Sequence, residues 1–556
     1  MSDLLAISPL IVCAVTGLLV MALDLLAGEG RKGFLAWVTM GGFAVAGVLA
    51  YLLWRTPVAL THPFFSGVFA LDPHGWFFAE VVLLSGGLAA LLAADHNPEQ
   101  GIQGGETYSL LAFSVTGAIL LVVATDLITL FLGLEIMSLS LYVLAASKPT
   151  SAFSAEAGMK YFLLGGVASA FLLMGAAFLY GATGHLGLAD IVRVLAAKGA
   201  DTDPLLVQGA VVLLVVALGF KVAAAPFHFW TPDVYEGAPT PITAFMAGAV
   251  KAAAFAVLAR VLLTLSRAPV FTGLDVTPGD LLLGLSVLSM IFGNVMGVVQ
   301  TNVKRILAYS SIAHAGYILL GVWATQNLEG TPGVQTLNDA VPFYLLAYAV
   351  ATVGAFGVLA LLGRAGEEDM SLDRIAGLGR RHPALGVALL VSVLSLAGLP
   401  PLGGFLAKFN LFRQVLTANP GTSLPWVVLA VLLSVVALYY YLRIILYAFF
   451  REPEGEPVPA IASRAGGIAL AVTVILTLAL GVAPGVFLDA SHTAAQATVL
   501  AADARPAPAV PAPAASAPAP RPRGDADPAR MLRSFQTGSR RMPVPAERPA
   551  PPPSRP

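Results

Sequence analysis

The chain is a succession of long apolar segments separated by short polar ones. Because a membrane-crossing helix needs about 20 predominantly apolar residues, this pattern predicts fourteen spanning segments. They lie at about 4–27, 33–54, 75–95, 107–124, 127–146, 160–181, 205–224, 241–265, 281–300, 305–323, 340–362, 384–416, 425–449 and 464–488. The twelfth is long because it is interrupted, and the seventh runs into an apolar stretch broken by prolines. The pattern therefore predicts an all-α polytopic membrane protein.

Composition agrees with this fold class and excludes several kinds of site. Hydrophobic residues make up 57% of the chain and charged residues 11%, whereas soluble domains carry about 25% charged residues. The single cysteine, Cys13, excludes disulfides within the chain and iron–sulfur or zinc sites built from several thiolates. The sequence has neither a strand–GxGxxG–helix unit nor a P-loop. Redox or nucleotide chemistry is therefore expected in partner proteins.

The distribution of charge predicts an orientation in the membrane. Thirteen Lys and Arg residues fall in or beside the odd-numbered loops and four beside the even-numbered ones. Because positive loops stay in the cytoplasm, both termini are expected outside, in the periplasm if the membrane is a bacterial inner membrane. Nucleic acid is not an expected partner, since the part before residue 503 has 28 acidic and 22 basic residues. Residues 503–556, rich in Pro, Ala and Arg, are predicted to be disordered.

Lys408 lies at membrane depth just after Pro400 and Pro401. A charge there costs roughly 2.5–3.5 kcal/mol on insertion scales, and the prolines break the helix and free backbone groups that need polar partners. Lys221 and Pro226 repeat this combination in the seventh segment. The two segments are five helices apart, and an odd offset inverts topology. The pattern therefore predicts two inverted repeats with sites at the helix breaks.

Lys251 is a third lysine deep in the membrane part. Burial disfavours an ammonium ion, so a buried lysine can exchange a proton near neutral pH, which arginine cannot do. Arg260 and Arg413 lie nearer to helix ends and can snorkel to the interface. The three lysines suit a proton relay. The alternative for each is a static ion pair that only holds helices together.

Two further ionisable residues, Glu135 and His314, lie inside predicted helices. Glu135, in the fifth segment, is the candidate partner of Lys221. His314, in the tenth, stands in the corresponding place under the offset of five; histidine titrates near neutrality, but this one can also be a packing residue. Asp233 and Glu236 follow the first break. They either attract protons at an entrance or cap helices.

Three segments carry a resemblance to a known family. They read LGFKVAAAPFHFWTPDVYEGAPTPITAFMAGAVKAAAFAVLAR, RILAYSSIAHAGYILLG and LAGLPPLGGFLAKFNLF. They resemble the antiporter-like proton-translocating subunits of respiratory complex I, over about residues 5–490. The resemblance implies an N-terminal three-helix segment at 1–106, inverted five-helix repeats at 107–266 and 280–450, and a C-terminal helix at 464–490. It also implies a proton relay of Glu135, Lys221, Lys251, His314 and Lys408.

The resemblance further implies a membrane subunit of a proton-pumping NADH:quinone oxidoreductase. NADH, FMN, iron–sulfur clusters and quinone would be bound by partner subunits. The expected partners are the other membrane and peripheral subunits, including sister antiporter-like subunits, and the lipid bilayer. Lysine at 408, where one sister branch usually has glutamate, and the lack of an apolar lateral helix after residue 490 separate the chain from two sister branches.

Two other functions remain open at this point. The first is a subunit of a multisubunit sodium/proton antiporter, which shares the lysine–glutamate core but has no redox partner. The second is a structural membrane scaffold with inert ion pairs.

Overall fold

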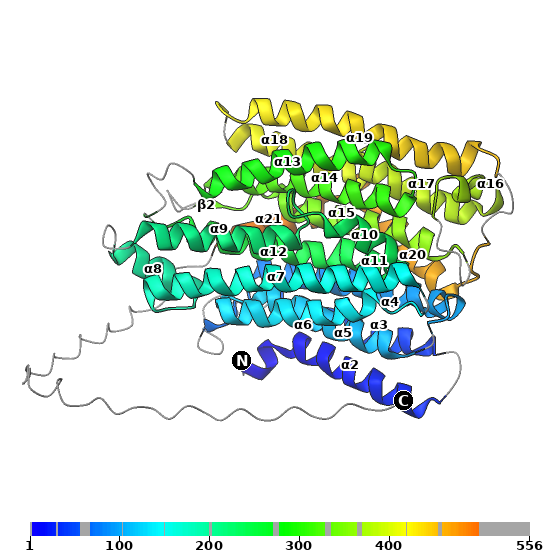
Figure 1. The fold of residues 1–556 in the computed structure, drawn as a ribbon, viewed down its shortest axis with the longest axis horizontal. Coiled ribbons are helices and arrows are strands. Elements are labelled where there is room, and N and C mark those ends of the chain that lie inside the picture. Colours follow the sequence, from blue (N-terminus) through cyan, green and yellow to red (C-terminus); the bar gives the residue numbers. More distant parts are fainter. Residues whose placement is uncertain are drawn as a thin grey trace, which may run out of the picture. The chain divides into compact units, whose positions relative to one another are not determined.

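Long helices lying side by side make up nearly all of the described structure (Figure 1). The computed structural model describes residues 3–28, 32–55, 67–102, 104–149, 151–198, 203–268, 270, 277–327, 335–363, 370–418, 420–453 and 459–499. The tail predicted to be disordered, residues 503–556, lies outside these ranges, as do the loop residues Arg31 and Arg364. Within the described ranges, thirteen helices are long and apolar enough to cross a membrane.

The helices and strands follow the predicted order. The first are α1 (Asp3–Ala6), α2 (Ser8–Leu26), α3 (Phe34–Trp54), α4 (Pro73–Glu99), α5 (Glu106–Val123), α6 (Leu127–Ala145) and α7 (Ala152–Thr183). Next come α8 (Leu188–Lys198), α9 (Pro204–Lys221), α10 (Trp230–Gly237), α11 (Thr240–Phe245), η4 (Met246–Val250), α12 (Lys251–Leu265), α13 (Pro278–Val299) and α14 (Val303–Trp323). The last are β1 (Gln326–Asn327), β2 (Gln335–Thr336), α15 (Ala340–Ala360), η6 (Asp373–Ile375), α16 (Leu378–Arg381), α17 (Pro383–Ala397), α18 (Gly403–Ala418), α19 (Leu424–Phe450), α20 (Arg464–Val482) and α21 (Gly485–Gln496).

Each of the fourteen predicted segments overlaps an observed helix, and the interrupted twelfth is the pair α17 and α18. The prediction of an all-α membrane fold is confirmed, apart from one short antiparallel pairing of β1 with β2. Helices α8 and α21 were not predicted, because 11 and 12 residues are too few to span. The expected C-terminal helix at 464–490 is divided, with α20 ending at Val482 and Pro484 preceding α21.

The Arg260 side chain is buried inside the protein, although its position near a helix end suggests that it reaches toward the membrane interface. Arg260 was expected to be able to snorkel to the interface, but its side chain is 1% exposed. Its Nη2 donates to Oδ1 of Asp72 at 2.6 Å. Asp72 is also the N-cap of α4, accepting from the Gly75 backbone N–H at 2.8 Å. A carboxylate at that helix start therefore pairs with the guanidinium inside the protein.

Two helix pairs approach each other at glycines, as is common between membrane helices. In α5 and α6, a Cβ on Gly117 would lie 2.3 Å from the backbone N of Met137. In α13 and α14, a Cβ on Gly293 would lie 2.4 Å from the backbone N of Ala313. Because the clashing atoms are backbone atoms, no side-chain rotation relieves these contacts.

We expect Gly293→Ala to destabilise the packing of α13 on α14 by about 1–3 kcal/mol, the usual effect of overpacking. Gly284→Ala on the same helix is the matched control, since a Cβ there meets nothing within 4 Å, and alanine raises helix propensity by up to about 1 kcal/mol. Thermal unfolding of the purified complex measures both changes. Equal stability of the two variants would contradict the close contact.

Candidate functional site

The first helix break lies between Lys221, the last residue of α9, and Trp230, the first of α10. Its freed backbone groups are hydrogen-bonded inside the protein. The Ala225 N–H donates to Ser289 Oγ at 2.8 Å, and the Phe220 carbonyl accepts from Trp230 Nε1 at 3.1 Å. Broken backbone at membrane depth is tolerated only with such partners or beside water. The proline pattern predicted this break correctly.

The second break, between α17 and α18, is built around Lys408. Gly398 adopts a left-handed φ of 85°, and the Gly404 N–H donates to Ser395 Oγ at 3.1 Å. The Lys408 Nζ donates to the carbonyls of Leu396 and Ala397, both at 3.1 Å. These carbonyls end α17, where the helix dipole is negative. The break thus forms a cation site without a carboxylate.

Lys221 and Glu135 do not form a direct ion pair in the described structure. The Lys221 Nζ donates to Ser138 Oγ at 2.8 Å, and Ser138 donates to the Leu134 carbonyl at 2.5 Å. Glu135 accepts a hydrogen bond from Ser169 of α7 instead. The predicted partner of Lys221 thus makes its hydrogen bond to another helix, and the described structure has no ion pair between the two residues.

Lys251 begins α12 directly after the π-helical turn η4. Its Nζ donates to the Ser311 carbonyl of α14 at 2.6 Å. Single π-helical turns inside α-helices are frequent at functional sites. His314 follows Ser311 by three residues on the same helix, so Lys251 reaches across to the helix that carries the histidine.

His314 is buried between two tyrosine hydroxyls. Its Nδ1 is 2.8 Å from the Tyr344 hydroxyl and its Nε2 is 3.1 Å from the Tyr441 hydroxyl. Tyr441 also hydrogen-bonds Ser310. A cavity of about 10 Å³ adjoins His314 and Leu396, close to the smallest volume that holds one water molecule. The Leu396 carbonyl accepts a hydrogen bond from Lys408, so Leu396 contacts both the cavity beside His314 and the Lys408 ammonium group.

The structure places all three lysines and His314 in the protein interior, each between 2% and 6% exposed. Glu135 is half-buried. Sequence reasoning missed the hydroxyl groups beside these residues, those of Ser138, Tyr344 and Tyr441. The sequence offered one indication of these hydroxyl groups. Tyr344 and Tyr348 are four residues apart and therefore lie on one helical face.

Asp233 and Glu236 of α10 join this helix to α7 and α14. Asp233 pairs with Lys160 of α7 at 2.5 Å and with Arg305 of α14 at 2.9 Å. Glu236 pairs with Arg305 at 2.7 Å. Phe229, not Asp233, is the N-cap of α10. Burial raises the pKa of Asp233, but the hydrogen bonds from Lys160 and Arg305 outweigh burial and hold that pKa below its usual value. Asp233 is therefore ionised at neutral pH.

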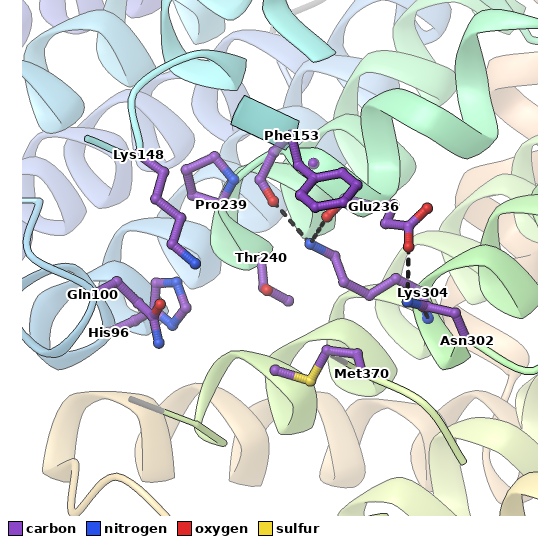
Figure 2. A pocket seen from close by; sticks show the side chains of 12 residues that line it. His96, Gln100, Lys148, Phe153, Glu236, Pro239, Thr240, Asn302, Lys304 and Met370 are labelled. Atoms are coloured by element: carbon purple, nitrogen blue, oxygen red, sulfur yellow. Dashed lines mark hydrogen bonds between the residues drawn. The ribbon is translucent and has the colours of Figure 1, made fainter. Parts of the chain in front are cut away.

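A cavity of about 290 Å³ lies beside this cluster (Figure 2). The Lys304 Nζ donates to the carbonyls of Glu236 and Ala238 at 2.7 and 2.8 Å, and Asn302 Nδ2 donates to Glu236 at 2.9 Å. Lys148 and His96 line its other side. None of Glu135, Lys221, Lys251, His314 and Lys408 is among its lining residues. The cavity is thus separate from the predicted relay.

Comparison with solved structures gives the fold an independent match. One chain of respiratory complex I from Thermus thermophilus, solved with bound aureothin, superposes with a TM-score of 0.71 at 37% identity, covering 87% of this chain and 99% of that one. A chain of the Mrp complex from Dietzia sp. DQ12-45-1b gives a TM-score of 0.72 at 23% identity, covering 88% and 97%. The second match concerns the fold alone.

Sequence comparison identifies the family. The family model described as NADH:quinone oxidoreductase/Mrp antiporter, TM, matches residues 124–436. NADH-quinone oxidoreductase subunit N from Chloroflexus aggregans is 41% identical over 488 residues, which cover 87% of this chain and 95% of that protein. This is also the branch that the lysine at 408 favours. The chain therefore belongs to the family of NADH-quinone oxidoreductase subunit N.

Proposed function

We propose that this chain translocates protons, as a membrane subunit of an NADH:quinone oxidoreductase, through a relay of Glu135, Lys221, Lys251, His314 and Lys408. The hydrogen bond from Lys251 to the Ser311 carbonyl carries the proposal. It links α12 to α14, the helix of His314. Ionisable side chains inside a membrane protein are expensive and are functional by default.

The relay begins with a change that arrives from the quinone-reducing part of the complex. It alters the electrostatic interaction between Glu135 and Lys221. Because a serine hydroxyl, and not the carboxylate, binds the Lys221 ammonium, the two charges can move relative to each other without breaking a salt bridge. The proton then passes through Lys251 and His314 to Lys408 and out. The water-sized cavity beside His314 supports a water-mediated step there.

The redox chemistry belongs to partner subunits. A single cysteine cannot hold an iron–sulfur cluster, and the sequence lacks a dinucleotide-binding fingerprint. NADH, FMN, the clusters and quinone are therefore assigned to other subunits of the complex. This chain contacts membrane subunits, including sister antiporter-like ones, peripheral subunits and lipid.

The proposal places the chain in a bacterial inner membrane with both termini in the periplasm, from the excess of Lys and Arg in the odd loops. It divides the membrane part into a three-helix segment at 1–106, inverted repeats at 107–266 and 280–450, and a C-terminal helix at 464–490. The corresponding breaks after Lys221 and before Lys408 support this division.

A sodium/proton antiporter subunit is the alternative. Identity favours the oxidoreductase, since it is 41% with a subunit N relative and 23% with the Mrp chain. Co-purification with NADH-oxidising subunits distinguishes the two functions.

We expect Lys408→Ala to lower proton pumping per NADH oxidised by about tenfold or more, since a positioned proton-transfer group contributes roughly 10²–10⁴-fold. Lys408→Arg separates proton release from static charge, because arginine keeps the positive charge but does not deprotonate in proteins. The Lys408→Arg variant should therefore also lose proton pumping. Pumping is measured with a pH-sensitive dye in vesicles that contain the assembled complex.

Lys198→Ala is the control for general loss of a lysine, because Lys198 is an exposed residue that donates to the Ala182 carbonyl. It should pump normally. Normal pumping by Lys408→Arg together with failure of Lys408→Ala would favour the static-charge reading and contradict the relay.

A second prediction concerns the anchor formed by Asp233. Asp233→Asn removes the charge that pairs with Lys160 and Arg305 and should destabilise the complex by up to about 1 kcal/mol, the scale of partly exposed pairs. Because the pKa of Asp233 is lowered, the contribution is present above the usual aspartate pKa. It is lost only as the pH falls through the lower, folded-state value.

The difference in thermal stability between wild type and Asp233→Asn should therefore stay constant from pH 5 to pH 8. A difference that changes within this window would show that Asp233 titrates near neutrality. That result would favour the proton entrance over the anchor.

A further inference from the structure

Each of the three relay lysines points its ammonium group at a tyrosine ring. The Lys408 Nζ lies 5.4 Å from the ring centre of Tyr317, and the Lys251 Nζ lies 5.6 Å from that of Tyr348. The Lys221 Nζ has two such rings, Tyr142 at 5.6 Å and Tyr161 at 5.5 Å. All of these distances fall within the roughly 6 Å range of cation–π attraction.

The remaining contacts of these ammonium groups are neutral. Their hydrogen bonds go to the Ser138 hydroxyl and to backbone carbonyls of Ser311, Leu396 and Ala397. Among the ion pairs of the described residues, none includes Lys221, Lys251 or Lys408. In the described structure each ammonium group is thus contacted by neutral hydrogen-bond acceptors and by aromatic faces.

A ring face and a carboxylate both favour an ammonium ion over a neutral amine, the ring face through its quadrupole. They differ in one respect that matters for a relay, because the ring face offers no basic atom that competes for the proton. A tyrosine face can therefore favour the protonated lysine while leaving the proton free to move on to the next group.

We propose that the rings of Tyr142, Tyr161, Tyr348 and Tyr317 are positioning residues that stabilise the protonated states of Lys221, Lys251 and Lys408 during proton transfer. The inference rests on the proposed relay. It adds the aromatic residues that set how stable the protonated form of each relay lysine is. It assigns the effect to the ring face, not to the hydroxyl group.

The hydroxyl contacts agree with this assignment. The Tyr348 hydroxyl is buried and makes no hydrogen bond of regular geometry among the described residues. The Tyr317 hydroxyl accepts from Asn294 Nδ2 at 3.0 Å, and Asn294 Oδ1 accepts from Tyr440 at 3.1 Å. In Tyr317 the hydroxyl thus serves to orient the ring, whereas the Tyr348 hydroxyl lies beside the Ser311 and Thr352 side chains without a hydrogen bond of regular geometry.

Tyr348 is the best position for the test. In the full complex, Tyr348→Phe keeps the ring face and should pump at close to the wild-type rate. Tyr348→Leu removes the face and should lower proton pumping per NADH about tenfold. Replacing Tyr348 by phenylalanines with one, two and three ring fluorines weakens the face stepwise at nearly constant shape. Pumping should fall in the same order.

Tyr439→Leu is the matched control. The Tyr439 ring lies under the Arg443 guanidinium at 5.7 Å, and because arginine keeps its charge, the loss of this face should leave pumping unchanged. Loss of pumping by Tyr348→Phe would assign the effect to the hydroxyl and overturn the proposal. Equal pumping by all fluorinated variants would overturn it as well, even if Tyr348→Leu assembled poorly.

Lys251→Ala, made in parallel, separates this inference from the proposed function. Normal pumping by Lys251→Ala would refute the relay itself. Loss of pumping by Lys251→Ala, with no dependence on ring fluorination at position 348, would refute only the role of the tyrosine face.

Discussion

The need of every backbone polar group for a partner, in a medium without water, governs this structure. Unbroken helices meet that need within themselves. The two breaks cannot, so serine hydroxyls and an indole supply bonds at Ala225, Gly404 and Phe220. At the second break the unsatisfied carbonyls take a lysine ammonium as their donor. A broken helix and a charge in the membrane are each unfavourable alone. Here the free carbonyls of the broken helix and the lysine ammonium satisfy each other.

The helix breaks also account for the contacts of Lys221 and Lys408, neither of which forms an ion pair within the described residues. Lys221 ends α9 and Lys408 binds the last carbonyls of α17, so both cations lie at the negative end of a half-helix. Neutral acceptors and ring faces complete both sites. The full ion pairs occur elsewhere: Asp72 with Arg260, and the cluster of Asp233, Glu236, Lys160 and Arg305. In the proposed relay the first group of contacts leaves protons exchangeable, while the second group joins helices to one another.

The sequence predicted the parts of this arrangement that depend on one segment at a time. Apolar length indicated the spans, and prolines beside lysines indicated both breaks. The sequence did not indicate the contacts that form when distant segments pack together. Glu135 and Lys221 were matched by charge, yet Ser138 binds the ammonium, because a residue one turn along α6 lies closer than the carboxylate. Arg260 near a helix end suggested snorkelling, and only the fold brings Asp72 to it. The hydroxyls around His314 come from two other helices, α15 and α19.

The π-helical turn at Met246–Val250 has a consequence for Lys251. An α-helix turns roughly 100° per residue, so the extra residue in this turn sets the direction in which every later side chain of α12 points. If the turn tightened to α-helical geometry, Lys251 would rotate away from the Ser311 carbonyl while α11 kept its place. The register of a single turn, rather than the position of an entire helix, therefore decides whether α12 and α14 are joined by this hydrogen bond.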